Sequence, residues 1–299
     1  MNTVDVAVTA EPFGRVRGRR SLTAQVVASF TRNKGSLIGA LVLAVLLVVV
    51  VAGPLIAPYD PTEQILTVAK KGPSAAHLLG TDQFGRDILS RVIVGARNTL
   101  GMPFLAIGFA LVLGVIPGLV AGYAGGWVDS LIMRLVDILL AFPGILLALM
   151  IVAMLGTGMV NIMLAIGVSL IPVYVRMARG STLSIRNEPY VDAARVLGSS
   201  DIRLLFRHVL PNLYGPLIVL STTAIGWGIL AGAALNFLGL GVQPPTPEWG
   251  RDLADGRNYL VTAWWITTFP GLVTMVTILA VNLVGDALTA VLDPMLRSR

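Results

Sequence analysis

The sequence of 299 residues has no cysteine and little charge. Only 13% of its residues are charged, against about 25% in soluble globular proteins, and 55% are hydrophobic. Without cysteine the chain can form no disulfide, thiolate nucleophile or cysteine-ligated metal site. With so few charges it cannot cover a water-facing surface, which indicates a chain embedded in lipid. In such a chain, the net charge of +6 indicates cytoplasmic loops rather than a nucleic-acid partner.

The sequence also lacks the residues of several kinds of active site. It has no Gly-x-x-x-x-Gly-Lys-Ser/Thr loop that would hold a nucleotide phosphate. A membrane-embedded enzyme would need paired acids, histidines, or a nucleophile with a base inside the apolar runs, and the two histidines lie outside them. We therefore expect a chain that is not an enzyme and that holds neither a metal nor another cofactor.

Long charge-poor runs predict six transmembrane helices. A helix needs about 20 apolar residues to cross a hydrocarbon core of about 30 Å. The run 138–175 is long enough for two spans, with a turn at Gly156-Thr157-Gly158. The other predicted runs are 36–57, 98–122, 209–247 and 266–292. The expected fold is therefore all-α and polytopic.

Basic residues predict the orientation of these spans. Six precede residue 36, six arginines against three acids lie in 176–208, and the chain ends Arg297-Ser-Arg299. All three segments fall on one side of a six-span chain, which the positive-inside rule assigns to the cytoplasm, together with both termini. The expected organisation is a cytoplasmic segment 1–35, a first span 36–57, an extracytoplasmic segment 58–97, and a five-helix core 98–299 that contains a cytoplasmic loop, 176–212.

Within this loop, the stretch 187–212 predicts two short helices. Pro189 suits a first helical turn, and Gly198 suits a helix end. Helical spacing of i, i+3, i+4, i+7 relates Tyr190, Ala193, Ala194 and Leu197, and then Ile202, Leu205, Phe206 and Val209. Ser199, Ser200 and Asp201 provide caps for the second helix, and Pro211 marks its end. Such short helices must pack either on the protein's own spans or in a groove of a cytoplasmic partner.

The same stretch resembles the EAA signature of permease subunits in bacterial ATP-driven importers. The similar residues are Tyr190-Val-Asp-Ala-Ala-Arg195, Gly198 and Leu210-Pro211-Asn212, with Asp192 where the family usually has Glu. Further segments are similar to the C permease of the dipeptide and oligopeptide branch: 80–97, 122–129, 237–250 and 282–294. The resemblance implies the type I importer permease fold in the bacterial plasma membrane.

The resemblance also implies partners and a function. The partners are a homologous second permease in a heterodimer, two ATPase subunits or a fused ATPase that bind Mg-ATP, an extracytoplasmic peptide-binding protein, and membrane lipid. The implied function is import of dipeptides or oligopeptides, coupled to ATP hydrolysis through 187–212. The residues expected to couple are Tyr190, Asp192, Ala193, Ala194, Leu197, Gly198, Arg203 and Arg207. Trp227 and Asn236 are candidates for lining the passage.

Several alternatives stay open. Asp192 can pair with a partner, or with Arg195 or Arg186 of its own chain. The same branch includes permeases for nickel, so another small solute is an alternative substrate. A stand-alone ion-coupled secondary transporter is an alternative of a different class. It would need ionisable residues near the bilayer midplane, and the predicted spans have none at their centres.

Overall fold

The computed structural model describes residue 30 and residues 33–292, and this part of the chain is helical. No β-strand occurs in it, apart from an isolated bridge between Thr81 and Asp87. The prediction of an all-α fold is therefore confirmed. The basic residues at 15–32 and 297–299, on which much of the predicted orientation depends, lie outside the described residues.

Within the described part, five helices are long and apolar enough to span a membrane, and a bent pair brings the number to six. The bent pair consists of α4 (Gly126–Leu140) and α5 (Gly144–Leu155), whose axes differ by 87°. The turn predicted at Gly156-Thr157-Gly158 is confirmed, because α5 ends at Leu155 and α6 begins at Met159. The long helices are α2 (Lys34–Ile56), α3 (Ile88–Ala124), α6 (Met159–Ile185), α9 (Leu210–Phe237) and α11 (Trp265–Leu292).

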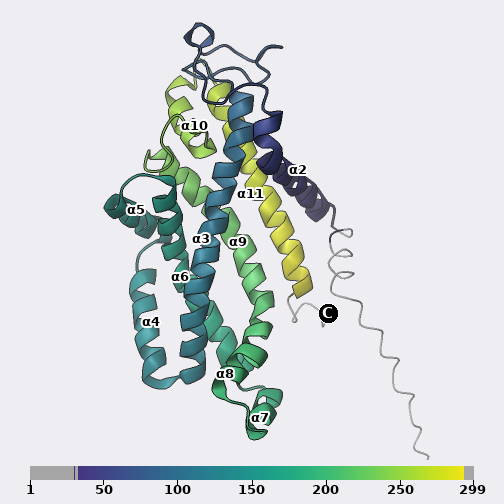
Figure 1. Ribbon diagram of the computed structural model, residues 1–299, viewed down its shortest axis with the longest axis vertical. Coiled ribbons are helices and arrows are strands. Elements are labelled where there is room, and N and C mark those ends of the chain that lie inside the picture. Colours follow the sequence, from purple (N-terminus) through teal and green to yellow (C-terminus); the bar gives the residue numbers. More distant parts are fainter. Residues whose placement is uncertain (1–29, 31–32, 293–299) are drawn as a thin grey trace, which may run out of the picture.

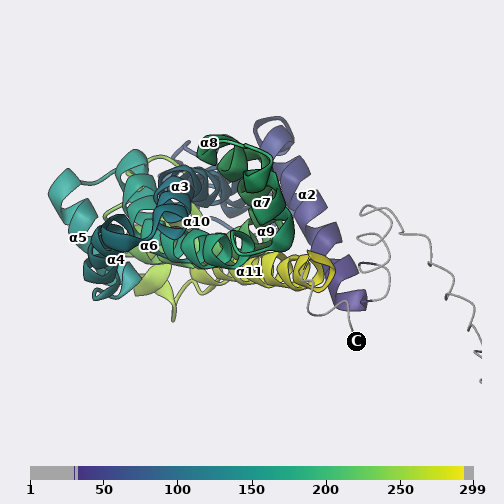
Figure 2. The same ribbon diagram turned by 90° about the horizontal axis from the view of Figure 1, so that it is seen from below.

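The short helices lie at opposite ends of the bundle (Figure 1). One end holds α7 (Pro189–Val196) and α8 (Asp201–Leu204), and is called the α7 end below. The other, the α10 end, holds α10 (Trp249–Gly256), the 3₁₀ turn η3 (Arg257–Tyr259), and the loop between α2 and α3 with its turn η1 (Leu66–Val68). Figure 2, seen from below, places α2 beside α11 at one edge of the bundle and α5 at the other.

The closest helix pair is α3 with α6, and glycine allows it. Gly114, Gly118 and Gly122 repeat at every fourth position and so share one face of α3. A Cβ atom on Gly114 would lie 2.5 Å from the Tyr174 Cβ, and one on Gly118 would lie 2.5 Å from the Val175 carbonyl oxygen. Because no side chain fits these gaps, the two backbones pack in direct contact, as small-residue stripes permit in membranes.

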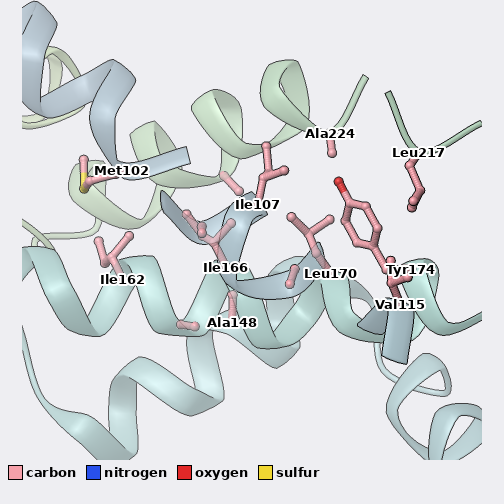
Figure 3. Close-up of a cluster of buried hydrophobic side chains, with 14 of the residues drawn as sticks. Met102, Ile107, Val115, Ala148, Ile162, Ile166, Leu170, Tyr174, Leu217 and Ala224 are labelled. Carbon is pink, nitrogen blue, oxygen red and sulfur yellow. The ribbon is translucent and has the colours of Figure 1, made fainter. Parts of the chain in front are cut away.

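A hydrophobic core fills the space between α3, α5, α6 and α9 (Figure 3). It includes Ile107 from α3, Ala148 from α5, Ile166 from α6 and Leu217 from α9. Tyr174 is fully buried in it, and its hydroxyl forms a hydrogen bond of 2.9 Å with the Ser221 hydroxyl. A second, smaller cluster contains Ile88, Val92 and Ile266. Many other large apolar side chains, above all those of α2, face outward, as lipid-exposed helices require.

Four helix ends differ clearly from the sequence prediction. The second span begins at Ile88 rather than at 98, the third begins at Gly126 rather than at 138, the fourth continues to Ile185 rather than ending at 175, and the fifth ends at Phe237 rather than at 247. For the first three of these ends, the prediction stopped at Arg97, Asp137 and Arg176. The structure pairs Asp137 with Arg176, and it pairs two charges of the additional turns, Arg91 with Asp252 and Asp129 with Arg179, so these charges do not interrupt the helices.

Candidate coupling loop and passage

The first short helix of the loop forms as its residues predict. Pro189 occupies the first turn of α7, where the missing N–H leaves no hydrogen bond unmade. Gly198 follows the helix with φ of +83°, a conformation that favours glycine. The N–H of Gly198 donates to the Arg195 carbonyl, and the N–H of Ser199 to the Ala194 carbonyl. This pair of bonds is a Schellman motif, which turns the chain sharply after α7.

The second predicted helix is instead the beginning of α9. Ser200 holds the N-cap position of α8, although its side chain makes no capping hydrogen bond. Pro211 does not end the helix, because α8 continues through a π turn (Leu205–Val209) into α9. In that turn the Leu210 N–H donates to the Leu205 carbonyl, one residue further back than in an α-helix. The extra residue accommodates the proline ring at the point where a regular helix would clash.

The predicted apolar face of α7 is exposed. Tyr190 is 45% exposed and Leu197 is 86% exposed, while Ala193 is exposed and Ala194 half-buried. The helix is attached to the rest of the chain by its other side, where Val191 is fully buried. The residues predicted to form the apolar face of the second helix differ in exposure. Ile202 and Phe206 are exposed, Leu205 is half-buried, and Val209 is buried, as is its neighbour Leu204.

The charged residues of the loop also face outward. Asp192 forms an ion pair of 2.9 Å with Arg195 one turn along α7, and both side chains are about half exposed. An exposed pair of this kind contributes little to stability, so it leaves Asp192 able to exchange partners. Arg203 and Arg207 are exposed and lie one helical turn apart. The Asn212 amide donates to the Tyr190 hydroxyl at 3.2 Å and so links α7 to the start of α9.

A cavity of about 410 Å³ lies beside α9, where α5, α6 and the α4–α5 bend approach it. Trp227, one of the two predicted passage residues, lines it and is half-buried. Phe142 at the bend and Val173 on α6 line it as well. The cavity is mostly apolar, with Ser169 and Thr223 as its hydroxyl groups. It offers a smooth wall without a charged group.

The second predicted passage residue, Asn236, lies inside the protein. Its side chain is 1% exposed. Its amide donates to the Gly232 carbonyl at 2.9 Å, and its oxygen accepts from the Val242 N–H at 2.7 Å. A side chain enclosed in this way presents no polar group to a passage. Asn236 instead fastens the loop after α9 to the helix, which is the task that a buried amide with satisfied hydrogen bonds performs.

The sequence analysis missed a buried ionic cluster at the α10 end. Arg86 contacts Asp82 at 2.5 Å, and Arg91 contacts Asp252 at 2.5 Å and 3.0 Å through two nitrogens. Arg86 and Arg91 are each 2% exposed. The cluster joins the α2–α3 loop and the start of α3 to α10. The signal was available in the charges of 80–87 and 248–255, which are concentrated in a chain that otherwise has few.

Glu248 belongs to the same region and caps α10. Its carboxyl accepts from the Arg251 N–H at 2.7 Å and from the Thr99 hydroxyl at 2.9 Å. Complete burial raises the pKa of Glu248 from 4.5 to about 7, against the opposing effect of these donors. The carboxyl therefore ties α3 to α10 in a site that favours its neutral form.

Two family models match this chain, one in its N-terminal region and one over most of the remainder. Residues 110–298 match the family of binding-protein-dependent transport system inner membrane components. Residues 21–73 match the N-terminal transmembrane domain of oligopeptide transport permease C. The first match covers more than half of the chain, and together the two matches agree with the resemblance found in its motifs.

Several relatives are similar over most of their length. The di/tripeptide transport system permease protein DppC of Pseudomonas aeruginosa is 46% identical over 90% of this chain and 91% of its own. A dipeptide permease DppC of Alkalihalophilus pseudofirmus is 42% identical, with coverages of 89% and 88%. The glutathione transport system permease protein GsiD of Escherichia coli is 43% identical, with coverages of 90% and 89%.

Among solved structures, inward-facing forms of the MetNI methionine ABC transporter share the fold. One superposes with a TM-score of 0.54 and 18% identity, covering 67% of this chain and 95% of the transporter chain. At that identity the likeness concerns the fold alone, and it confirms the type I importer permease fold predicted from the motifs. The chain is therefore a multi-pass membrane protein that belongs to the family of binding-protein-dependent transport system inner membrane components, as a C-type permease subunit of an ABC importer.

Proposed function

We propose that this chain imports small peptides together with a homologous second permease. The observation that carries the proposal is the exposed apolar face of α7, held on a defined corner at one end of a chain that has no nucleotide-binding loop. The relatives named for di- and tripeptides, dipeptides and glutathione support small peptides as the substrate class. Nickel remains the alternative that the uptake experiment below tests.

The α7 face is the proposed docking site for an ATPase subunit that binds Mg-ATP. Tyr190 and Leu197 provide exposed apolar contact area, Ala193 and Ala194 allow a partner backbone to approach closely, and Asp192 provides a carboxylate at the rim. Helices with such a face bind by lying in a groove of the partner. Arg203 and Arg207 lie beside this face and would meet acidic groups of the same partner.

The passage is proposed to run along α9, between this chain and the second permease. An outward-facing stripe of α9 joins the cavity at Trp227 to the α10 end, and its members recur at helical spacing: Thr223, Trp227, Leu230, Ala234 and Leu238. These side chains are apolar or small, apart from the Thr223 hydroxyl. A wall of this kind binds no particular side chain strongly, which suits a passage for peptides of varied sequence.

The proposed orientation places the α7 end in the cytoplasm of a bacterium and the α10 end outside the plasma membrane. Arginines of the loop support it: Arg195, Arg203 and Arg207 are exposed at the α7 end. Both termini are then cytoplasmic, and the extracytoplasmic binding protein delivers its peptide at the α10 end. When the ATPases close on ATP, they move α7 and convert the bundle between inward-open and outward-open states.

The experiment is uptake into proteoliposomes that contain this chain, its second permease, the ATPases and the binding protein. Labelled dipeptide, tripeptide and glutathione are tested separately, each with Mg-ATP inside, and nickel is tested as a competitor and as a substrate. We expect ATP-dependent uptake of at least one peptide and none without the binding protein. Uptake of nickel without peptide uptake, or uptake driven by an ion gradient in the absence of ATP, would contradict the proposal.

A further inference from the structure

The last turn of α3 holds both ends of the α7 segment. On one side, Arg186, which follows α6, donates from Nη1 to the carbonyls of Gly122 at 2.9 Å and of Tyr123 at 3.1 Å. On the other side, the Tyr123 hydroxyl donates to an Asp201 carboxylate oxygen at 2.5 Å, at the first residue of α8. The chain therefore leaves α3's neighbourhood at 186, forms α7 and its glycine corner, and returns to α3 at 201.

The Tyr123 hydroxyl also meets α7 itself. Arg195 of α7 lies close to this hydroxyl, and the interaction raises the pKa of the Arg195 guanidinium above its usual value. Arg195 in turn contacts Asp192, one of the residues expected to dock. One hydroxyl on α3 thus lies at the start of α8 and beside the last turn of α7, on either side of the Gly198 corner.

We propose that Tyr123 is a positioning residue that transmits displacement of α7 to α3, an inference that rests on the proposed docking of the ATPase at α7. The corner needs such a contact, because Gly198 has no neighbour within 4 Å of its Cβ position in the described part of the chain, and Leu197 and Ile202 on either side are exposed. Without Tyr123, α7 keeps the buried Val191 and the Tyr190–Asn212 hydrogen bond toward its beginning, but the corner side loses its contact with α3.

The contact leads through α3 to α6, which lines the cavity at Trp227. Tyr123 follows Gly122, the last glycine of the stripe along which α3 packs on α6. A Cβ atom on Gly122 would lie 2.7 Å from the Thr182 Cβ and 2.8 Å from the Arg179 carbonyl oxygen, so the two helices are in backbone contact at this level. Because packed backbones do not slide freely, a displacement received by α3 moves α6 with it.

The test compares transport with ATP hydrolysis in the reconstituted complex. Tyr123→Phe removes only the hydroxyl. We expect the complex to assemble in normal amounts and to hydrolyse ATP, while the number of peptides imported per ATP falls at least threefold. Asp201→Ala should have the same effect, and the double variant should be no worse than either single one, since both remove one interaction. Asp201→Asn keeps an oxygen that accepts from Tyr123, and should restore most of the ratio.

The outcomes separate this inference from the docking proposal. If Leu197→Asp abolishes ATPase binding while Tyr123→Phe leaves the ratio of peptides to ATP unchanged, the docking stands and the role of Tyr123 is overturned. A loss of assembled complex in Tyr123→Phe, with the ratio unchanged in the remainder, would assign Tyr123 a stabilising role only and would also overturn it. If Leu197→Asp leaves ATPase binding intact, the docking proposal itself is wrong.

Discussion

At the scale of single residues, substitution on the exposed face of α7 should affect ATPase binding and not stability. Leu197 is exposed, so Leu197→Asp should change the stability of the chain by no more than about 0.5 kcal/mol. It places a charge in the proposed apolar contact, and we expect the ATPase subunits no longer to co-purify. Leu260→Asp is the matched control, because Leu260 is an exposed leucine at the opposite end. Equal ATPase recovery with both variants would contradict the assignment of the docking face.

The raised pKa of Glu248 predicts how the stability of the folded chain depends on pH. Its pKa is raised to about 7 in the folded chain, above the value of 4.5 expected when unfolded, so the folded state binds more protons between these values. Stability should therefore fall as pH rises from about 4.5 to 7, by roughly 3 kcal/mol or less, since one pKa unit corresponds to about 1.4 kcal/mol.

Thermal unfolding of the purified complex between pH 5 and 8 measures this dependence. Glu248→Gln cannot ionise and should remove most of the slope, while its amide oxygen still accepts from the Arg251 N–H. Glu63→Gln, at an exposed glutamate of the α2–α3 loop, should keep the slope of the original protein. The burial of Glu248 would not be the cause if its variant retained the slope.

At the scale of elements, the contact of α3 with α6 predicts a sharp difference between two glycines of one helix. Gly118→Ala would place its Cβ 2.5 Å from the Val175 carbonyl oxygen and 2.7 Å from the Ala178 Cβ. We expect it to separate the helices and to destabilise the chain by about 1–3 kcal/mol, as overpacking does. Gly108→Ala has open space around its Cβ position in the described structure, and should be neutral or stabilising.

Thermal unfolding in detergent distinguishes the two variants. A Gly118→Ala protein as stable as Gly108→Ala would mean that α3 and α6 are not in backbone contact. The inference about Tyr123 would then lose the element through which it acts.

The helices also show how much of this structure can be predicted from the sequence. Charge-free runs predicted the spans, and local spacing with Pro189 and Gly198 predicted α7 and its corner, because each depends on residues that are neighbours in sequence. Helix ends at Ile88 and Gly126 were missed, because charges there are neutralised by partners far along the chain. Asn236 was named as a passage candidate because it is a polar residue in an apolar span, and the structure encloses it with hydrogen bonds to Gly232 and Val242, four and six residues away.

At the scale of the whole molecule, α3 connects its two ends. Near one end, Arg91 and Thr99 join it to α10 through Asp252 and Glu248. At the other, Tyr123 joins it to the coupling loop. The proposed function, with an ATPase at one end and peptide at the other, needs a continuous element of this kind, and α3 spans the bundle as a single helix of 37 residues.

The central claim is that the exposed face of α7 receives the ATPase. Because the natural chain has no cysteine, one introduced thiol is a unique handle. Leu197→Cys, carrying a photoactivatable cross-linker in the assembled complex, should form a covalent adduct with an ATPase subunit. Val261→Cys, at a side chain that is 97% exposed at the α10 end, should form none. An adduct from Val261→Cys and none from Leu197→Cys would contradict both the docking site and the orientation proposed for the chain.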